Sequence, residues 1–125
     1  MRNKTRPKHL DLTKIRLPLP GFVSILHRVS GFGMFLMIGM LLGVLALSLE
    51  SPNGYERAVG YLTGWFGKLV VLGLIWAFAH HFVAGIRFLL LDLHVGTELS
   101  AARKSSALVL ILSISLTVIL GVTIW

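Results

Sequence analysis

Apolar residues along this chain gather in three long runs and do not alternate regularly with polar ones. The runs cover approximately residues 29–49, 65–91 and 105–125. Each is long enough to cross the hydrocarbon core of a bilayer, which takes about 20 residues as a helix. The pattern therefore predicts an all-α membrane protein with three transmembrane helices.

The segments between these runs indicate where the helices end. Three prolines fall within residues 1–20, and proline disfavours helix in the residue that precedes it. The turn signal Ser-Pro-Asn-Gly at 51–54 closes the first run. We expect an N-terminal arm, 1–20, followed by a three-helix transmembrane domain, 21–125, with helices at about 21–50, 60–93 and 105–125.

The composition agrees with a membrane protein. Of the 125 residues, 55% are hydrophobic and only 14% are charged, and the mean hydropathy is +0.83. A soluble domain of this size carries more charge, about a quarter of its residues. The chain has no cysteine, which excludes disulfides, cysteine-ligated zinc and cysteine-ligated iron–sulfur clusters.

The positive charges predict the orientation of the chain. The formal net charge is +7, and seven of the twelve basic residues fall within the first 28 positions. Arg103 and Lys104 flank the second connection, whereas the first connection carries Glu50 and Glu56. Cytoplasmic loops are enriched in Lys and Arg, so we expect a cytoplasmic N-terminus and a periplasmic C-terminus. The first apolar run is too long for a signal peptide, and we expect a multi-pass protein of a bacterial inner membrane.

Two adjacent histidines, His80 and His81, lie in the middle of the second apolar run. An ionisable residue at the bilayer centre costs about 3 kcal/mol on insertion and usually marks function. One interpretation is an imidazole that hydrogen-bonds to a neighbouring helix. The other is an axial ligand to haem iron, a role that histidine commonly fills.

The helical neighbours distinguish the two histidines. Residues four apart share a helix face, and the ladder through His81 holds only small residues: Gly73, Ala77 and Gly85. A flat macrocycle fits closely against such a face, whereas Trp76 precedes His80 on its own ladder and would crowd it. If one of the pair binds haem, His81 is the better candidate.

A second polar group lies at the predicted cytoplasmic ends of the helices. Ser24 and Arg28 are four residues apart on the first helix, with His27 beside them, and Arg87 and Asp92 lie near the end of the second. Ordinary anchoring of arginines in lipid headgroups explains this pattern. A polar pocket in which Ser24 and Arg28 bind a quinone also explains it, with arginines pairing with haem propionates.

Two motifs carry a resemblance to a known family. Ser-x-x-His-Arg-x-Ser at 24–30 and His-x-x-x-Gly-x-Arg from 81, followed by Asp92, resemble the cytochrome b556 membrane-anchor subunits of bacterial succinate dehydrogenase. The resemblance covers nearly the whole chain. One departure is Phe88, where members of the family often carry a second histidine after the motif arginine.

The resemblance implies a role for each matching residue. It makes His81 an axial ligand of haem b, assigns Ser24 and Arg28 to the ubiquinone site, and places His27 and Arg28 near the haem propionates. It implies a second small membrane anchor that shares the haem and supplies the other histidine. It also implies an iron–sulfur subunit and a flavoprotein that carries the succinate-oxidising site, so this chain would act only as a non-autonomous subunit.

Two other functions are weighed against this one. A haem-free structural anchor of a peripheral respiratory enzyme would need the same three helices. A small proton-coupled transporter subunit is disfavoured, because its acidic residues would lie in mid-membrane. Here the acidic residues of the spans and connections all lie at helix ends or in the connections: Glu50, Glu56, Asp92 and Glu98.

Overall fold

The computed structural model describes residues 16–125, and within that range the chain is all-helical. The helices are α1 (Leu19–Glu50), α2 (Pro52–Thr63), α3 (Trp65–Asp92) and α4 (Leu99–Ile124). Three of them, α1, α3 and α4, are long and apolar enough to cross a membrane, which confirms the three predicted spans. Most of the expected arm, 1–20, lies outside the described residues.

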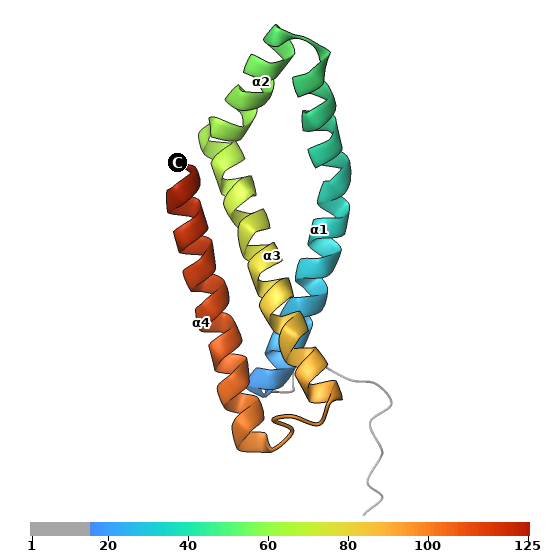
Figure 1. Cartoon of the computed structure of the whole chain (residues 1–125), viewed down its shortest axis with the longest axis vertical. Helices are drawn as coiled ribbons and strands as arrows, with labels where there is room; N and C mark the ends of the chain where they lie inside the picture. Colours follow the sequence, from blue (N-terminus) through green and yellow to red (C-terminus); the bar gives the residue numbers. More distant parts are fainter. Residues whose placement is uncertain (1–15) are drawn as a thin grey trace, which may run out of the picture.

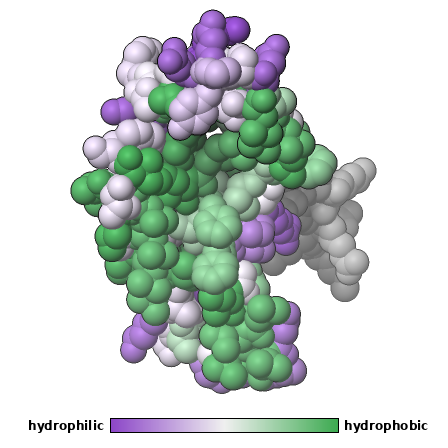
Figure 2. Space-filling model, turned by 45° about the horizontal axis from the view of Figure 1, so that its top comes forward, coloured by the Kyte–Doolittle hydropathy of each residue, from purple (hydrophilic) through white to green (hydrophobic). Residues whose placement is uncertain are grey.

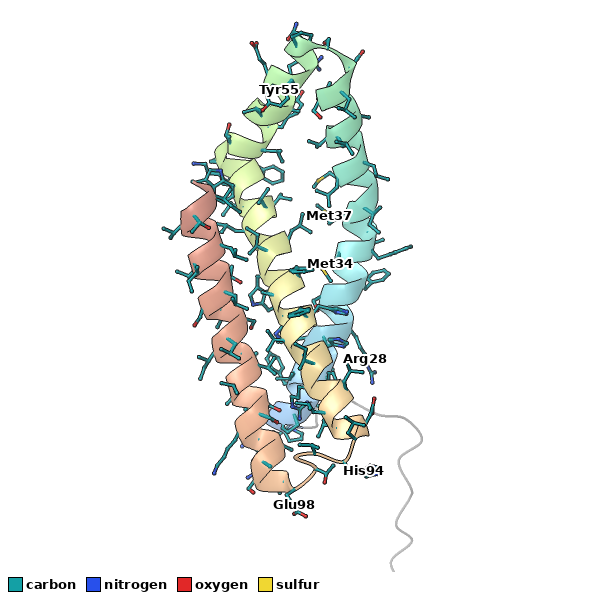
Figure 3. All side chains as sticks on the ribbon, in the orientation of Figure 1. Arg28, Met34, Met37, Tyr55, His94 and Glu98 are labelled. Atoms are coloured by element: carbon teal, nitrogen blue, oxygen red, sulfur yellow. The ribbon has the colours of Figure 1, made fainter. Side chains whose placement is uncertain are left out.

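The long helices run alternately up and down (Figure 1). The first helix, α1, runs the length of the molecule, α2 turns back, α3 continues in the same sense as α2, and α4 returns alongside α3. The start of α1 therefore lies at the same end as the α3–α4 connection. Arg28, His94 and Glu98 lie towards this end and Tyr55 at the other (Figure 3). Which end faces the cytoplasm stays a prediction.

A serine cap separates α1 from α2. Ser51 is extended, with φ −166° and ψ 166°, and its hydroxyl accepts a hydrogen bond from the backbone N–H of Gly54 at 3.0 Å. Pro52 follows at the first helical position, where its missing N–H costs nothing. The Ser-Pro-Asn-Gly turn signal is thus the capped start of a short helix.

The helix predicted over 60–93 is interrupted near its start, ahead of the second apolar run. Gly64 is extended, with ψ 156°, and separates α2 from α3. Its N–H donates to the Gly60 carbonyl at 3.0 Å and its carbonyl accepts from the Lys68 N–H at 2.8 Å. Both backbone polar groups of Gly64 therefore remain hydrogen-bonded at the break. Gly67 lies so close to the Tyr61 carbonyl that any side chain there would collide with it.

A tight turn joins α3 to α4. The N–H of Val95 donates to the Leu90 carbonyl at 2.9 Å and that of His94 to the Leu91 carbonyl at 2.9 Å, the pattern by which a Schellman motif satisfies the last carbonyls of a helix. Gly96 has a φ of 75°, which favours glycine. The following helix begins at Leu99, ahead of the apolar run itself.

The buried core is small and lies between the three long helices. Val23 of α1, Ala84 of α3 and Val109 of α4 form its centre. Large hydrophobic side chains remain exposed along all three long helices, and they cover most of the face shown in Figure 2 between hydrophilic ends. Such a surface requires lipid or partner subunits around it, as expected for a chain that crosses a membrane.

Candidate functional site

His81 is held by the backbone of α1. Its Nδ1 lies 2.9 Å from the carbonyl oxygen of His27 and 3.4 Å from the hydroxyl of Ser30. A carbonyl oxygen only accepts hydrogen bonds, so Nδ1 must carry the proton in the neutral imidazole. The other ring nitrogen, Nε2, then keeps its lone pair, which is the form of histidine that binds a metal.

Small residues on α1 allow the His81 imidazole to lie this close to the backbone of α1. Ser30 is only 3% exposed, and its hydroxyl donates to the His27 carbonyl at 2.9 Å. Gly31 lies directly against the imidazole: a Cβ at this position would be 2.7 Å from Cε1 of His81 and 3.1 Å from Nδ1. Because real Cβ atoms do not approach so closely, the imidazole can occupy this place only beside glycine.

The imidazole ring of His27 stacks on that of His81. The ring centroids are 4.0 Å apart and the planes differ by 10°, and Phe88 adjoins the His27 ring at a centroid distance of 5.1 Å. Gly85, on the small-residue ladder of α3, lies opposite His27, whose Nε2 would be 3.6 Å from a Cβ there. Gly73, further along the ladder, has nothing within 4 Å of such a Cβ.

His80 has entirely different surroundings. Its side chain is 0% exposed, and neither ring nitrogen has a hydrogen-bond partner among the described residues. Its ring packs on Trp76, with centroids 5.3 Å apart and planes 23° from parallel. The two neighbouring histidines therefore point to different places, and only His81 has a backbone partner that sets its tautomer.

An apolar cavity of about 460 Å³ lies between α1 and α3 beside this site. Gly31, which contacts the His81 ring, is part of its wall. The other lining residues are all apolar: Met34, Phe35, Ile38, Leu41, Leu74 and Phe78; Met34 is labelled in Figure 3. A concave, mostly apolar wall next to a few polar groups is typical of a cofactor site.

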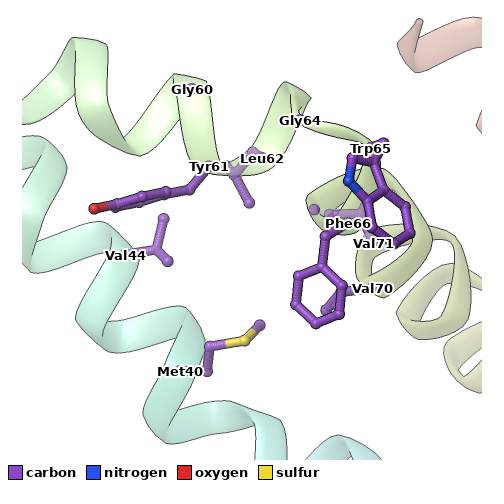
Figure 4. A pocket seen from close by; sticks show the side chains of 11 residues that line it. Met40, Val44, Gly60, Tyr61, Leu62, Gly64, Trp65, Phe66, Val70 and Val71 are labelled. Carbon is purple, nitrogen blue, oxygen red and sulfur yellow. The ribbon is translucent and has the colours of Figure 1, made fainter.

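A second apolar cavity, of about 440 Å³, lies near the other end of the molecule. It lies between Met40 and Val44 of α1 and the break between α2 and α3, where Tyr61 and Trp65 border it (Figure 4). None of the candidate residues from the sequence lines it. The cavity is therefore separate from the His81 site.

Ser24 and Arg28 lie on α1 on either side of the turn that carries His27. The side chain of Ser24 is half-buried and that of Arg28 is exposed on this chain, with Arg28 visible at the flank of α1 in Figure 3. Ser24, His27, Arg28 and Ser30 thus come from one short segment of a single helix. Only His27 and Ser30 contact His81.

Arg87 does not lie among lipid headgroups, as ordinary interfacial anchoring would require. Its side chain is 6% exposed. The guanidinium Nε donates to the Ser105 hydroxyl of α4 at 3.0 Å, and a terminal nitrogen donates to the Ala102 carbonyl at 3.4 Å. The apolar interior between helices makes such bonds strong, so Arg87 joins α3 to α4. Asp92 is exposed at the end of α3.

The described residues fit one kind of metal-containing group better than another. Between residues 16 and 125, no three His, Cys, Asp or Glu side chains lie close enough together to hold a bare metal ion. The porphyrin of a haem supplies four ligands to the iron, and the protein supplies the axial ligands. His81, with Nδ1 protonated and an apolar cavity beside it, fits the role of one axial ligand.

Sequence reasoning found His81 and His27 but assigned no role to Ser30 or Gly31. Both lie within the motif at 24–30 or directly after it. Their contacts with His81 join residues at least 50 positions apart in the chain. The only available signal was the spacing of three between His27 and Ser30, which allows a serine hydroxyl to reach a carbonyl of its own helix.

Comparison with known proteins identifies the family of the chain. The family model described as the succinate dehydrogenase/fumarate reductase transmembrane subunit matches residues 2–120. The chain is 35% identical over 125 residues to the succinate dehydrogenase cytochrome b556 subunit of Coxiella burnetii, covering 98% of this chain and 99% of that protein. It is 32% identical over 114 residues to the subunit of the same name from Paracoccus denitrificans, covering 91% and 88%.

A more distant relative, the cytochrome b556 subunit of Rickettsia typhi, is 29% identical over 117 residues, which cover 94% of this chain and 91% of that protein. These matches extend through all three membrane-spanning helices, and they confirm the resemblance inferred from the two motifs. They also confirm a multi-pass bacterial membrane protein. The chain belongs to the family of succinate dehydrogenase and fumarate reductase transmembrane subunits.

Proposed function

We propose that the chain is a haem-b-binding membrane anchor of succinate dehydrogenase. In this role it takes part in electron transfer from an iron–sulfur subunit to ubiquinone and forms part of the quinone site. Its relatives are named cytochrome b556 subunits of succinate dehydrogenase, which supports the proposal. The chain acts as a subunit, and succinate is oxidised on a partner.

The observation that carries the proposal is the hydrogen bond between Nδ1 of His81 and the His27 carbonyl, at 2.9 Å. Metal-binding histidines usually donate their second ring N–H to a carbonyl or carboxylate, which fixes the tautomer and the ring plane. His81 therefore presents Nε2 as an axial ligand. When bound, haem b supplies a one-electron carrier within the membrane.

A second subunit must complete the haem site. His80 is adjacent to His81 on the same helix and packs on Trp76, so it is not available for the opposite face of the same haem. We propose that a second small membrane anchor shares the haem and supplies the other histidine. The remaining partners are the iron–sulfur subunit and the flavoprotein.

The quinone site is proposed at the start of α1. Ser24 donates a hydrogen bond to a quinone carbonyl, and the exposed Arg28 stabilises the negative charge that develops there on reduction. His27 and Arg28 lie near the haem propionates. Ser24 and Arg28 lie within one turn of His27 on α1, and the ring of His27 stacks on that of His81 on α3. This proximity supports a single redox path at what we propose is the cytoplasmic side of a bacterial inner membrane.

A haem-free structural anchor is the alternative. One observation favours it: the His27 ring already covers a face of His81 at a centroid distance of 4.0 Å, and Nδ1 is satisfied by the backbone. In that case His81 would serve only to join α1 to α3, and the membrane complex would show no b-type absorption.

A reduced-minus-oxidised spectrum of membranes that contain the complete complex distinguishes the haem-binding anchor from the haem-free anchor. We expect a b-type signal in the wild type, its loss in His81→Ala, and its retention in His80→Phe, which keeps an aromatic ring at the neighbouring position. Because neither nitrogen of His80 has a hydrogen-bond partner between residues 16 and 125, the phenyl ring should be tolerated. A complex that assembles without any b-type signal would establish the structural anchor instead.

A further inference from the structure

The hydroxyl of Ser30 contacts the same carbonyl as His81, the proposed haem ligand. Its Oγ donates to the His27 carbonyl at 2.9 Å and lies 3.4 Å from Nδ1 of His81. Nδ1 itself lies 2.9 Å from that carbonyl. Two donors therefore share one acceptor, and a change in one of them alters the strength of the other.

We propose that Ser30 is a positioning residue that tunes the basicity of His81, and through it the reduction potential of the haem. The inference rests on the proposed function, since it concerns the ligand role of His81. A stronger hydrogen bond from Nδ1 to a carbonyl makes an imidazole a more basic ligand, and a more basic ligand stabilises the oxidised iron. The Ser30 hydroxyl draws on the same oxygen and so limits this effect.

The burial of Ser30 makes this competition effective. The side chain is 3% exposed, so water does not replace the hydroxyl proton on the carbonyl. Electrostatic interactions are also stronger in such surroundings than in water. The absence of a side chain at Gly31 lets the imidazole edge lie against the same stretch of backbone, which keeps Nδ1 close to the His27 carbonyl.

The test is a redox titration of the haem in the complete complex that carries Ser30→Ala. Without the hydroxyl, the His27 carbonyl accepts from His81 alone, and we expect the midpoint potential to shift to a more negative value. Ser30→Thr restores a hydroxyl that can reach the same carbonyl, and we expect it to return the potential towards that of the wild type.

Ser113→Ala is the matched control. Ser113 is 0% exposed, and its hydroxyl donates to a carbonyl three residues earlier, that of Leu110, at 3.0 Å, but on α4. We expect its haem potential to equal that of the wild type. An equal shift in Ser113→Ala and Ser30→Ala would overturn the proposal, because it would show a general response to lost helix packing.

The remaining outcomes also test the role of Ser30 or the proposed function. An unshifted potential in Ser30→Ala with normal haem content contradicts the tuning role and leaves the proposed function intact. If Ser30→Ala retains no haem, haem retention by Ser30→Thr supports the role of the hydroxyl, and its absence contradicts it. A wild-type complex without haem refutes the proposed function itself.

Discussion

Two neighbouring histidines of α3 differ in every contact that matters for chemistry. His81 donates to the backbone of α1, whereas both nitrogens of His80 are buried without a partner among the described residues. Adjacent residues on a helix point about 100° apart, since one turn takes 3.6 residues. That rotation alone directs one imidazole to the α1 backbone and the other into the packed interior.

A substitution at Gly31 tests whether haem binding depends on the contact between α1 and the His81 ring. We expect Gly31→Ala to lower the haem content of the complex several-fold, because the added Cβ would lie only 2.7 Å from Cε1 of His81 and would displace the ring. Alanine favours helix over glycine by about 1 kcal/mol, so a loss cannot be attributed to a weaker helix. The measurement is the b-type absorbance per assembled complex.

Gly33→Ala is the control for this substitution, since a Cβ at Gly33 meets nothing within 4 Å in this chain. It lies on the same helix and gains the same helix propensity. A normal b-type signal in Gly31→Ala would show that His81 can bind haem without its contact to α1.

The proposed quinone residues allow a separate prediction. Ser24→Ala and Arg28→Leu should reduce succinate-to-quinone activity at least tenfold, about 1.4 kcal/mol of lost stabilisation, because each removes a hydrogen-bond donor to the quinone. Succinate oxidation with an artificial dye acceptor should persist. Loss of both activities would instead indicate failed assembly.

The candidate site was only partly predictable from the sequence. The ladder of small residues distinguished His81 from His80, because helical spacing is fixed by local geometry. Ser30 and Gly31 were not identified, because their importance depends on where α1 crosses α3. That crossing is a tertiary contact which periodicity within one helix does not report.

At the scale of helices, the contact between Arg87 and α4 is a buried polar link between α3 and α4. The guanidinium is buried and donates to the Ser105 hydroxyl and the Ala102 carbonyl. The hydroxyl of Ser105 also donates to the Ala102 carbonyl, at 3.2 Å. The arginine thus depends on α4 for these hydrogen bonds, and α4 is oriented by them.

Ser105→Ala tests this link. It leaves the buried guanidinium of Arg87 without one of its acceptors, and we expect it to destabilise the complex by about 1–3 kcal/mol. The measurement is thermal or denaturant unfolding of the purified complex in detergent. Ser48→Ala serves as control, because it removes an exposed hydroxyl bond, to the Leu45 carbonyl of α1. Equal stability of the two variants would contradict the proposed link.

Sequence reasoning predicted the number of long helices correctly and missed the division between α2 and α3. The second apolar run begins at about residue 65, but the predicted helix was extended back to residue 60 across Gly64, whereas α3 begins at Trp65. The break instead depends on backbone contacts, above all the close approach of Gly67 to the Tyr61 carbonyl. The end of the first helix near residue 50 was predicted, because Ser-Pro-Asn-Gly is a turn signal, but the short helix that begins at Pro52 was not predicted.

At the scale of the whole molecule, the path of the chain brings the start of α1 and the α3–α4 connection to one end (Figure 1). The basic residues of the second connection, Arg103 and Lys104, belong to the first turns of α4 at that end. The charge-based orientation likewise places the N-terminus and the second connection on one side of the membrane. The assignment of that end to the cytoplasm follows only from the positive-inside rule.

Single cysteines test the orientation directly, since the natural chain has none to remove. Asn53→Cys at the start of α2 should react with a membrane-impermeant maleimide in spheroplasts. Glu98→Cys, just before α4, should react only in inverted membrane vesicles. Both positions are exposed in this chain, and denatured samples control for thiol reactivity. The opposite pattern would reverse the predicted topology.

The bond between His81 and the His27 carbonyl also has a consequence for biogenesis. Its two partners lie on different spans, so Nδ1 gains its acceptor only after α1 and α3 have both entered the membrane and packed together. A newly inserted α1 does not yet have α3, which carries His81, beside it. Before it packs on α1, α3 presents an imidazole whose tautomer is not fixed by a hydrogen bond to the His27 carbonyl. In the proposed role of His81 as a haem ligand, haem loading therefore follows helix pairing, and chains whose helices have not paired do not take up haem at this site.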